Sequence, residues 1–280
     1  LKIVDFIKID CLNNTPEQWE GWIKQIKNSK LPRHPAIVAT RVETAVLARR
    51  CFEAGVDYSQ GFYYMEPEIV KGKTLTSNQH TIFNLLNLLL EENPVSDIEE
   101  AFRRDPGLSY QLLRYLNSAG MTRGQEIESI RQALILLGRH PLQRWLTLLL
   151  FASRGTQKSS ILTMAATRAK FAEILREKSP VLDDQPATIH RSFLAGMLSL
   201  LDVYLKQPLP DLLNELKISD EMRKALIYHE GEDGAVLGLI EAAEHGDLDT
   251  VKEMGKKLGL PLAEITTASL DAMNWASSLK

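Results

Sequence analysis

The chain has 280 residues, of which 44% are hydrophobic and 25% are charged, as is usual for a folded globular protein of one or two domains. Its net charge of −3 at pH 7 excludes the basic surface of a protein that binds nucleic acid by bulk attraction. No apolar run reaches the roughly 18 residues that a membrane-spanning helix needs. The cysteines, Cys11 and Cys51, have no metal-type spacing, so we expect a cytoplasmic protein without a structural disulfide.

The N-terminal segment alternates predicted strands and helices. Short runs of β-branched and apolar residues predict strands at 3–9, 36–40 and 60–64. A capping box that starts at Thr15 predicts a helix over 16–27, and Gly55 is placed to end a second helix over 44–54. This βαβαβ order predicts parallel strands. Because the chain starts at Leu1 within a predicted strand, we expect a fragment of a longer protein.

The pattern changes near residues 66–78, where proline, glycine and polar residues interrupt the periodicity. Nearly every later segment has helical periodicity, which predicts one domain over 1–73 and a second over 77–280. Ser96, Ser129 and Pro141 mark expected helix starts, and Gly138 an expected helix end. Further helices are predicted over 161–178, 187–205, 210–216, 220–228, 236–245, 248–258 and 261–278.

Three runs in the N-terminal segment resemble a known family. They are VDFIKID at 4–10, VET at 42–44 and GVDYSQGF at 55–62. Their order and spacing resemble the last third of the EAL domain, a cyclic di-GMP phosphodiesterase with a (β/α)8 barrel. The resemblance implies an α/β remnant of an EAL-type barrel at the start of the chain.

The same resemblance implies that this remnant has lost its chemistry. Lys8, Glu43 and Gln60 match active-site positions of the family, whereas Thr40 stands in place of an acidic residue. The earlier strands, which would carry the other acidic groups, are absent, so no water would be activated by a metal. We therefore predict no catalytic residue and no cofactor, and we interpret the four matching positions as vestigial.

A second resemblance lies in the helical part. It rests on DPGL at 105–108, LNSA at 116–119 and the stretch from Ile127 to Gly138, which contains SIRQAL. These motifs resemble the HDOD domain, a relative of the HD metal-dependent phosphohydrolases. The resemblance implies an all-α domain and, with the first one, a bacterial EAL–HDOD signalling protein.

The metal site of the HD enzymes is expected to be degenerate. Ser199 and Leu200 stand where the family has its His–Asp pair, and the helix around 166–169 lacks the expected histidine. Leucine cannot bind a cation, and serine is a poor ligand for first-row metals. Three other residues, His190, Asp202 and His229, are weak candidates for a leftover site, but a helix dipole alone accounts for a histidine at 229. We predict no bound metal.

These observations predict a non-catalytic signal-transduction or scaffold module. It would contact an unknown signalling protein, without nucleic acid or membrane as partners, in a pathway related to cyclic di-GMP. An open barrel edge would favour a homo-oligomer. Two alternatives remain open: the chain is the C-terminal piece of a metal-dependent cyclic di-GMP phosphodiesterase, or it is a cyclic di-GMP sensor with a dead barrel.

Overall fold

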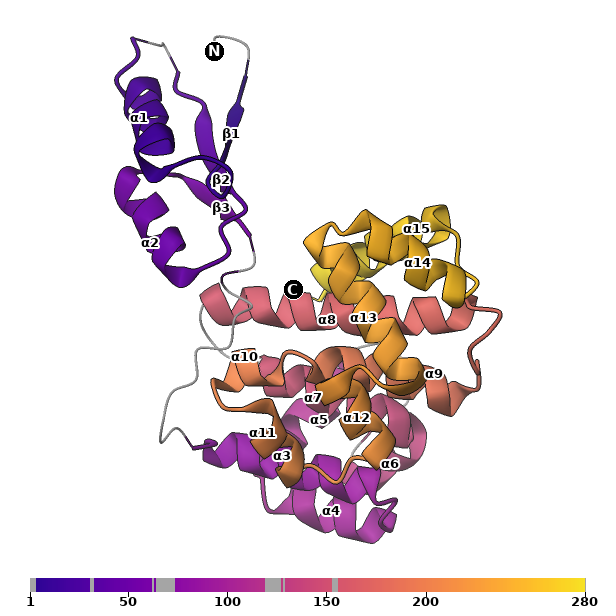
Figure 1. Ribbon diagram of the computed structural model, residues 1–280. Coiled ribbons are helices and arrows are strands. Elements are labelled where there is room, and N and C mark those ends of the chain that lie inside the picture. The colour runs from indigo at the N-terminus through magenta and orange to yellow at the C-terminus, as the bar shows by residue number, and fades with distance from the viewer. Residues whose placement is uncertain are drawn as a thin grey trace. The chain divides into compact units, whose positions relative to one another are not determined.

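The computed structural model describes residues 4–30, 33–61, 63, 74–118, 127, 129–152 and 156–279, with the backbone alone at 118 and 156–159. The chain divides into two compact units, Leu1–Glu68 and Ile69–Lys280 (Figure 1). The first unit contains a small sheet with helices, whereas the described part of the second is helical.

The first unit is a parallel sheet with two helices. The strands pair in the order β1-β2-β3, and both pairings are parallel. The elements are β1 (Phe6–Asp10), α1 (Pro16–Lys27), β2 (Ala36–Thr40), α2 (Ala45–Ala54) and β3 (Tyr58–Gln60). As the sequence predicts, the capping box at Thr15 starts α1, and the left-handed Gly55, with φ 96°, ends α2.

Only one face of this sheet is buried. Trp19 and Ile23 of α1 and Cys51 of α2 pack with Ile37 of the sheet in one apolar cluster. The alternate residues of the strands face away, and Phe6 and Tyr58 are 61% and 58% exposed. Figure 1 shows both helices on the same side of the strands.

The prediction of an EAL-type (β/α)8 barrel remnant is wrong. The chain is 70% helical, and its described strands form a small three-stranded sheet in which no remnant of a barrel is evident. Strand–helix alternation and parallel pairing are shared by all βαβ units, so they do not specify a barrel. Closure requires a set of tilted and staggered strands, whereas β3 has three residues.

The second unit is an array of packed helices. The long helix α8 runs through its middle, next to α9, α13 and α15 (Figure 1). Its helices are α3 (Ser77–Leu90), α4 (Val95–Arg103), α5 (Pro106–Ser118), α6 (Ile130–Leu137), α7 (Arg139–Phe151), α8 (Thr156–Lys178), α9 (Pro186–Leu198), α10 (Leu201–Leu205), α11 (Leu209–Glu215), α12 (Asp220–Tyr228), α13 (Gly231–His245), α14 (Leu248–Lys257) and α15 (Leu262–Ser277). Among the described residues, no helix combines the length and apolar character needed to cross a membrane.

Several helix boundaries in this unit differ from the prediction, among them the start of α7 at Arg139 instead of Pro141 and the start of α13 at Gly231 instead of residue 236. Helix α4 begins one residue before Ser96, with Pro94 as its N-cap. The helix predicted over 187–205 is broken after α9, and the Oγ of Ser199 donates to the carbonyl of Gly196 at 2.8 Å. A side chain that bonds to its own backbone in this way competes with helix continuation.

Candidate functional site

The predicted residues of the first unit lie near the ends of its strands. Lys8 Nζ on β1 donates to Gln60 Oε1 on β3 at 3.4 Å, and Thr40 Oγ1 donates to the carbonyl of Ile9 at 3.2 Å. Glu43 is exposed next to Thr44, which accepts from the amide of Leu47 as the N-cap of α2. These contacts are local polar contacts, and they bring together no set of acidic side chains.

In the second unit, a close approach of two helices positions the candidate site. A Cβ atom on Gly196 of α9 would lie only 2.6 Å from the backbone of Ala169 on α8. Glycine therefore allows the two backbones to touch here. The approach brings Arg168 of α8 beside Ser199, which is the first of the two positions where the HD resemblance expects a metal ligand.

Arg168 is the centre of this site. Its side chain is only 6% exposed. Its Nε and Nη2 donate to the carboxylate of Glu244 at 3.0 and 2.7 Å, and Nη1 donates to Ser199 Oγ at 3.1 Å and to Glu241 at 3.4 Å. The fork of the guanidinium suits such a two-point contact with a carboxylate. We call Arg168, Ser199, Glu241, Glu244 and His229 the Arg168 cluster.

His229 joins the cluster through Glu241. It ends α12 in a left-handed conformation with φ 55°, and its Nε2 lies 3.1 Å from Glu241 Oε2. The hydrogen bond with Glu241 raises the pKa of His229. Burial raises the pKa of Glu241, but the hydrogen bond from His229 and the charge of Arg168 outweigh burial and leave this pKa below its usual value. Both effects favour an ion pair.

The other predicted residues separate into different surroundings. Burial raises the pKa of Asp202. The charges of Arg168 and Glu241 also act on this pKa, so Asp202 lies near both residues. Leu200 is a buried core residue that is 3% exposed. His190 contacts different partners, Gln143 and Arg144 of α7. Of the three weak metal candidates, His229 therefore belongs to the Arg168 cluster, Asp202 lies near it, and His190 has other partners.

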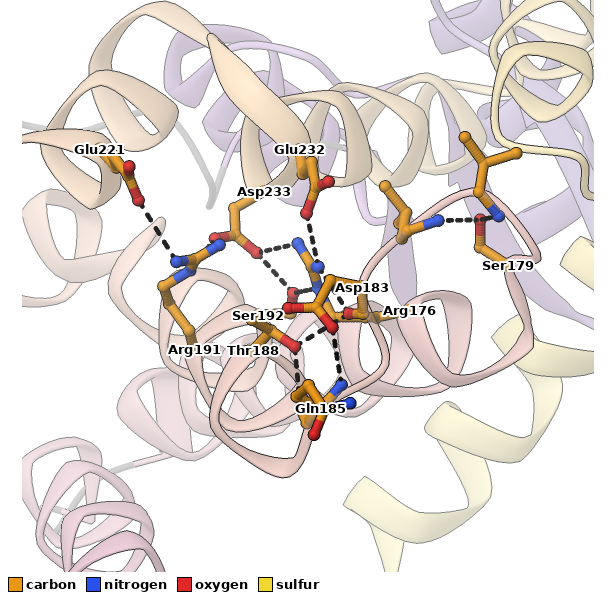
Figure 2. A network of polar contacts seen from close by, with 12 residues as sticks. Arg176, Ser179, Asp183, Gln185, Thr188, Arg191, Ser192, Glu221, Glu232 and Asp233 are labelled. Carbon is orange, nitrogen blue, oxygen red and sulfur yellow. Dashed lines mark hydrogen bonds and ion pairs between the residues drawn. The ribbon is translucent and has the colours of Figure 1, made fainter.

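A second arginine on α8 organises another polar network (Figure 2). Arg176 is 0% exposed, and its Nε donates to Ser192 Oγ on α9 at 2.5 Å. Its two terminal nitrogens donate to the carbonyl of Asp183, to Glu232 and to Asp233, each at 2.8 to 2.9 Å. Arg191 Nε also donates to Asp233, at 2.6 Å. We call these residues the Arg176 network.

In the Arg168 cluster, the positive charge is supplied by the protein itself, through the guanidinium of Arg168. Its carboxylates face a guanidinium, and within the part of the chain that the structure describes no three His, Cys, Asp or Glu side chains are arranged to hold a metal ion. Arginine is always protonated and offers only donors, so it cannot activate a water as a metal ion does.

Three residues of this cluster were missed as site residues in the sequence: Arg168, Glu241 and Glu244. A local signal existed, because Arg168 stands between Ala165, Ala166 and Ala169, all of which are fully buried. A charged residue on a buried helix face requires a partner. The acidic partners, more than 70 residues away along the chain, gave no local indication of the pairing.

Comparisons with known proteins identify the helical unit. The family model of the HDOD domain matches residues 75–230. The chain is 32% identical over 284 residues to YuxH of Bacillus subtilis (strain 168), covering 100% of this chain and 67% of that protein. It is 27% identical over 244 residues to the cyclic di-GMP phosphodiesterase CdgJ of Vibrio cholerae, covering 86% of this chain and 56% of that protein. No solved structure matches.

A helical domain with a buried arginine that pairs with two carboxylates is thus the class that fold and site define. The chain belongs to the HDOD domain family. This confirms the HDOD part of the sequence interpretation. No EAL domain match accompanies it, and nothing indicates a degenerate EAL part. The chain spans about two thirds of YuxH and little more than half of CdgJ.

Proposed function

We propose that this chain is a non-catalytic signalling module that acts by contacting another protein, in a bacterial pathway related to cyclic di-GMP. The observation that carries the proposal is the position of Arg168. From the helix where the HD resemblance expects a histidine ligand, it places a fixed positive charge on Glu241 and Glu244 and donates to Ser199. A divalent ion could take the place of this guanidinium only by leaving the buried charge of Arg168 unpaired, which would be costly.

The link to cyclic di-GMP rests on a relative. CdgJ of Vibrio cholerae bears the name cyclic di-GMP phosphodiesterase and shares 27% identity over 86% of this chain. The shared part includes much of the HDOD domain. A domain whose described residues form no metal cluster, and which is shared with such a protein, is suited to passing a signal by docking. The partner would be a signalling protein of the same pathway.

A second candidate function is suggested by the same relative. The chain would then be one part of a cyclic di-GMP phosphodiesterase, because CdgJ extends beyond the matched region. A third candidate, a cyclic di-GMP sensor, requires binding without hydrolysis. The three functions make different predictions for one pair of measurements.

The first measurement is hydrolysis of cyclic di-GMP by the purified chain with Mg²⁺ or Mn²⁺, followed by chromatography of the linear dinucleotide. We expect no turnover above a buffer blank, because the described residues present no metal cluster. Turnover that is lost in both Lys8→Ala and His229→Ala would contradict the proposal and favour the phosphodiesterase.

The second measurement is a calorimetric titration of cyclic di-GMP into the same chain. The proposal predicts no saturable heat. Saturable binding without turnover would favour the sensor instead. Glu53→Gln, at an exposed position of α2, is a suitable control, since removal of one surface carboxylate should leave either result unchanged.

A further inference from the structure

A partly apolar cavity opens in the HDOD domain, and no member of the Arg168 cluster lines it. It has a volume of about 200 Å³, compared with about 150 Å³ for an engineered cavity that binds benzene. Its walls come from α3, α9, α12 and the segment between α11 and α12. The aliphatic side chains that line it are Leu86, Leu90, Leu194, Leu198, Leu216, Ile218 and Met222.

One wall of the cavity is fixed by a single asparagine. Asn87 Nδ2 on α3 donates to the carbonyl of Glu215 at 2.8 Å, and Asn87 Oδ1 accepts from the amide of Lys217 at 2.8 Å. This pair of bonds holds the segment after α11 against α3. Ser219 also lines the cavity. Its Oγ accepts from the amide of Met222 and caps the start of α12. The cavity is therefore a fixed feature of the helix packing.

The floor of the cavity is polar and deeply buried. His190 and Gln143 are each 5% exposed, and Thr147 is 0% exposed. Burial, followed by the charges of His140 and Arg144, lowers the pKa of His190 to about 3. The imidazole is therefore neutral at physiological pH.

Hydrogen bonds determine what this floor can offer a ligand. Arg144 Nε can only donate, so the Nδ1 of His190, 3.4 Å away, accepts, and Nε2 then carries the proton. That Nε2 donates to Gln143 Oε1 at 2.6 Å, which leaves the –NH2 of Gln143 as its donor end. Thr147 Oγ1 donates to the carbonyl of Gln143 at 2.7 Å, so its lone pairs remain acceptors.

The cationic residues at the rim have partners of their own. Arg191 donates to Asp233 and Glu221, and Lys217 Nζ lies 3.9 Å from Glu91. A charged head group would thus have to be buried against a neutral floor. Burying an unpaired charge is far less favourable than burying a polar group that forms hydrogen bonds.

We propose that this cavity binds a small neutral amphipathic molecule, with an aliphatic body against the leucines and a hydroxyl or amide head on Gln143 and Thr147. By comparison with benzene in 150 Å³, the body and head together have about eight non-hydrogen atoms. Binding of such a molecule would not depend on the signalling function proposed above. The HDOD domain would then respond directly to the concentration of a small molecule.

The test uses two probes of equal size, hexanamide and hexanoate, titrated into the full chain at neutral pH. Binding is followed by calorimetry and by the NMR signal of the Met222 methyl group. Hexanamide is expected to bind with a dissociation constant on the order of 1 mM or below, and hexanoate about tenfold more weakly or worse because its charge is not paired. Equal affinities, or no saturable change with hexanamide, would overturn the proposal.

Variants place the binding in this cavity. Leu90→Trp fills the cavity from a half-buried position and should weaken hexanamide binding about tenfold or more. Thr147→Val keeps the shape but removes the acceptor, and should weaken it about two- to tenfold. Leu136→Trp, at a residue that is 54% exposed on α6, is the matched control and should not change it. Unchanged affinity in Leu90→Trp would show that the ligand binds elsewhere and would contradict the inference.

Discussion

Two buried arginines on α8, Arg168 and Arg176, are held in the same way. Each donates to a serine, Ser192 within α9 or Ser199 at its C-terminal cap, and each pairs with two carboxylates of α13. The arginines are eight residues apart, the serines seven, and Asp233 and Glu241 again eight. Because such spacings are close to two helical turns, the same three helices are joined twice, by the same chemistry.

The two sites differ in their exposure to solvent. In the Arg176 network, the arginine is 0% and Asp233 5% exposed, and Arg191 supports Asp233 from its other side, whereas Glu232 at the edge of the network is 45% exposed. In the Arg168 cluster, Glu241 is 33% and His229 41% exposed. In both sites, a buried guanidinium on α8 holds α13 against it through ion pairs. At Arg168, the paired Glu241 and His229 remain accessible to solvent, so this site can respond to pH.

Removal of Arg176 should have the largest effect. Arg176→Ala leaves Asp233 buried with fewer donors, and breaking a buried ion pair costs about 3–5 kcal/mol of unfolding free energy. Urea unfolding followed by circular dichroism measures this loss. Arg191→Ala, which removes a half-exposed donor to the same carboxylate, should cost clearly less. A loss below about 1 kcal/mol for Arg176→Ala would mean that the network is not a structural lock.

The matching change in the Arg168 cluster should be milder. Arg168→Ala leaves Glu244 without its arginine partner and Glu241 with His229 alone, and water can partly solvate both carboxylates because they are 21% and 33% exposed. We expect a loss of about 1–3 kcal/mol in the same unfolding experiment. If Arg168→Ala proved as damaging as Arg176→Ala, the distinction between an open and a closed site would fail.

A glycine between the two serines sets the spacing of both sites. In Gly196→Ala, the new methyl group would lie 2.6 Å from the backbone of Ala169 and push α8 and α9 apart. Overpacking of this kind costs about 1–3 kcal/mol. Gly107→Ala, where the nearest atom is a side-chain oxygen at 3.3 Å, is the control and should change stability by less than about 0.5 kcal/mol. Equal stabilities of the two variants would contradict the close helix contact.

The smallest effect is a pH dependence that only the Arg168 cluster should show. The folded pKa of His229 is raised above 6.5, so its protonated form stabilises the native state. This contribution is complete below pH 6.5 and is lost as the pH rises through the folded pKa. Because His229 is 41% exposed, we expect well under ~1 kcal/mol.

The measurement is the melting temperature of the wild type minus that of His229→Gln across this pH range. The difference should shrink toward higher pH. The corresponding difference for Arg176→Ala should stay constant, because arginine remains protonated. A constant difference for His229→Gln would show that its pairing with Glu241 contributes nothing.

Local signals in the sequence predicted most helix ends. Thr15, Ser129 and Gly55 each act through their own backbone neighbours, and the structure confirms all three caps. The helix over 220–228 has the predicted bounds, and the one over 248–257 ends one residue early. The HDOD motifs, likewise confined to a short stretch, identified the family correctly.

The errors lie where distant residues decide the outcome. Ser199 breaks a helix that its own sequence would continue, and its Oγ accepts from Arg168, 31 residues away. The barrel prediction failed because strand–helix alternation does not specify closure. The site assignments at Lys8, Thr40, Glu43 and Gln60, and the absence of a metal, remain predictions.

The metal content of the purified chain tests the central claim most directly. The claim is that Arg168 serves as the cation of this site, so that no divalent ion is bound there. Inductively coupled plasma mass spectrometry, after expression with manganese, iron and zinc supplied, should find far less than one equivalent per chain, and the same in Ser199→His combined with Leu200→Asp. About one equivalent of iron, manganese or zinc, lost in His229→Ala, would contradict the account.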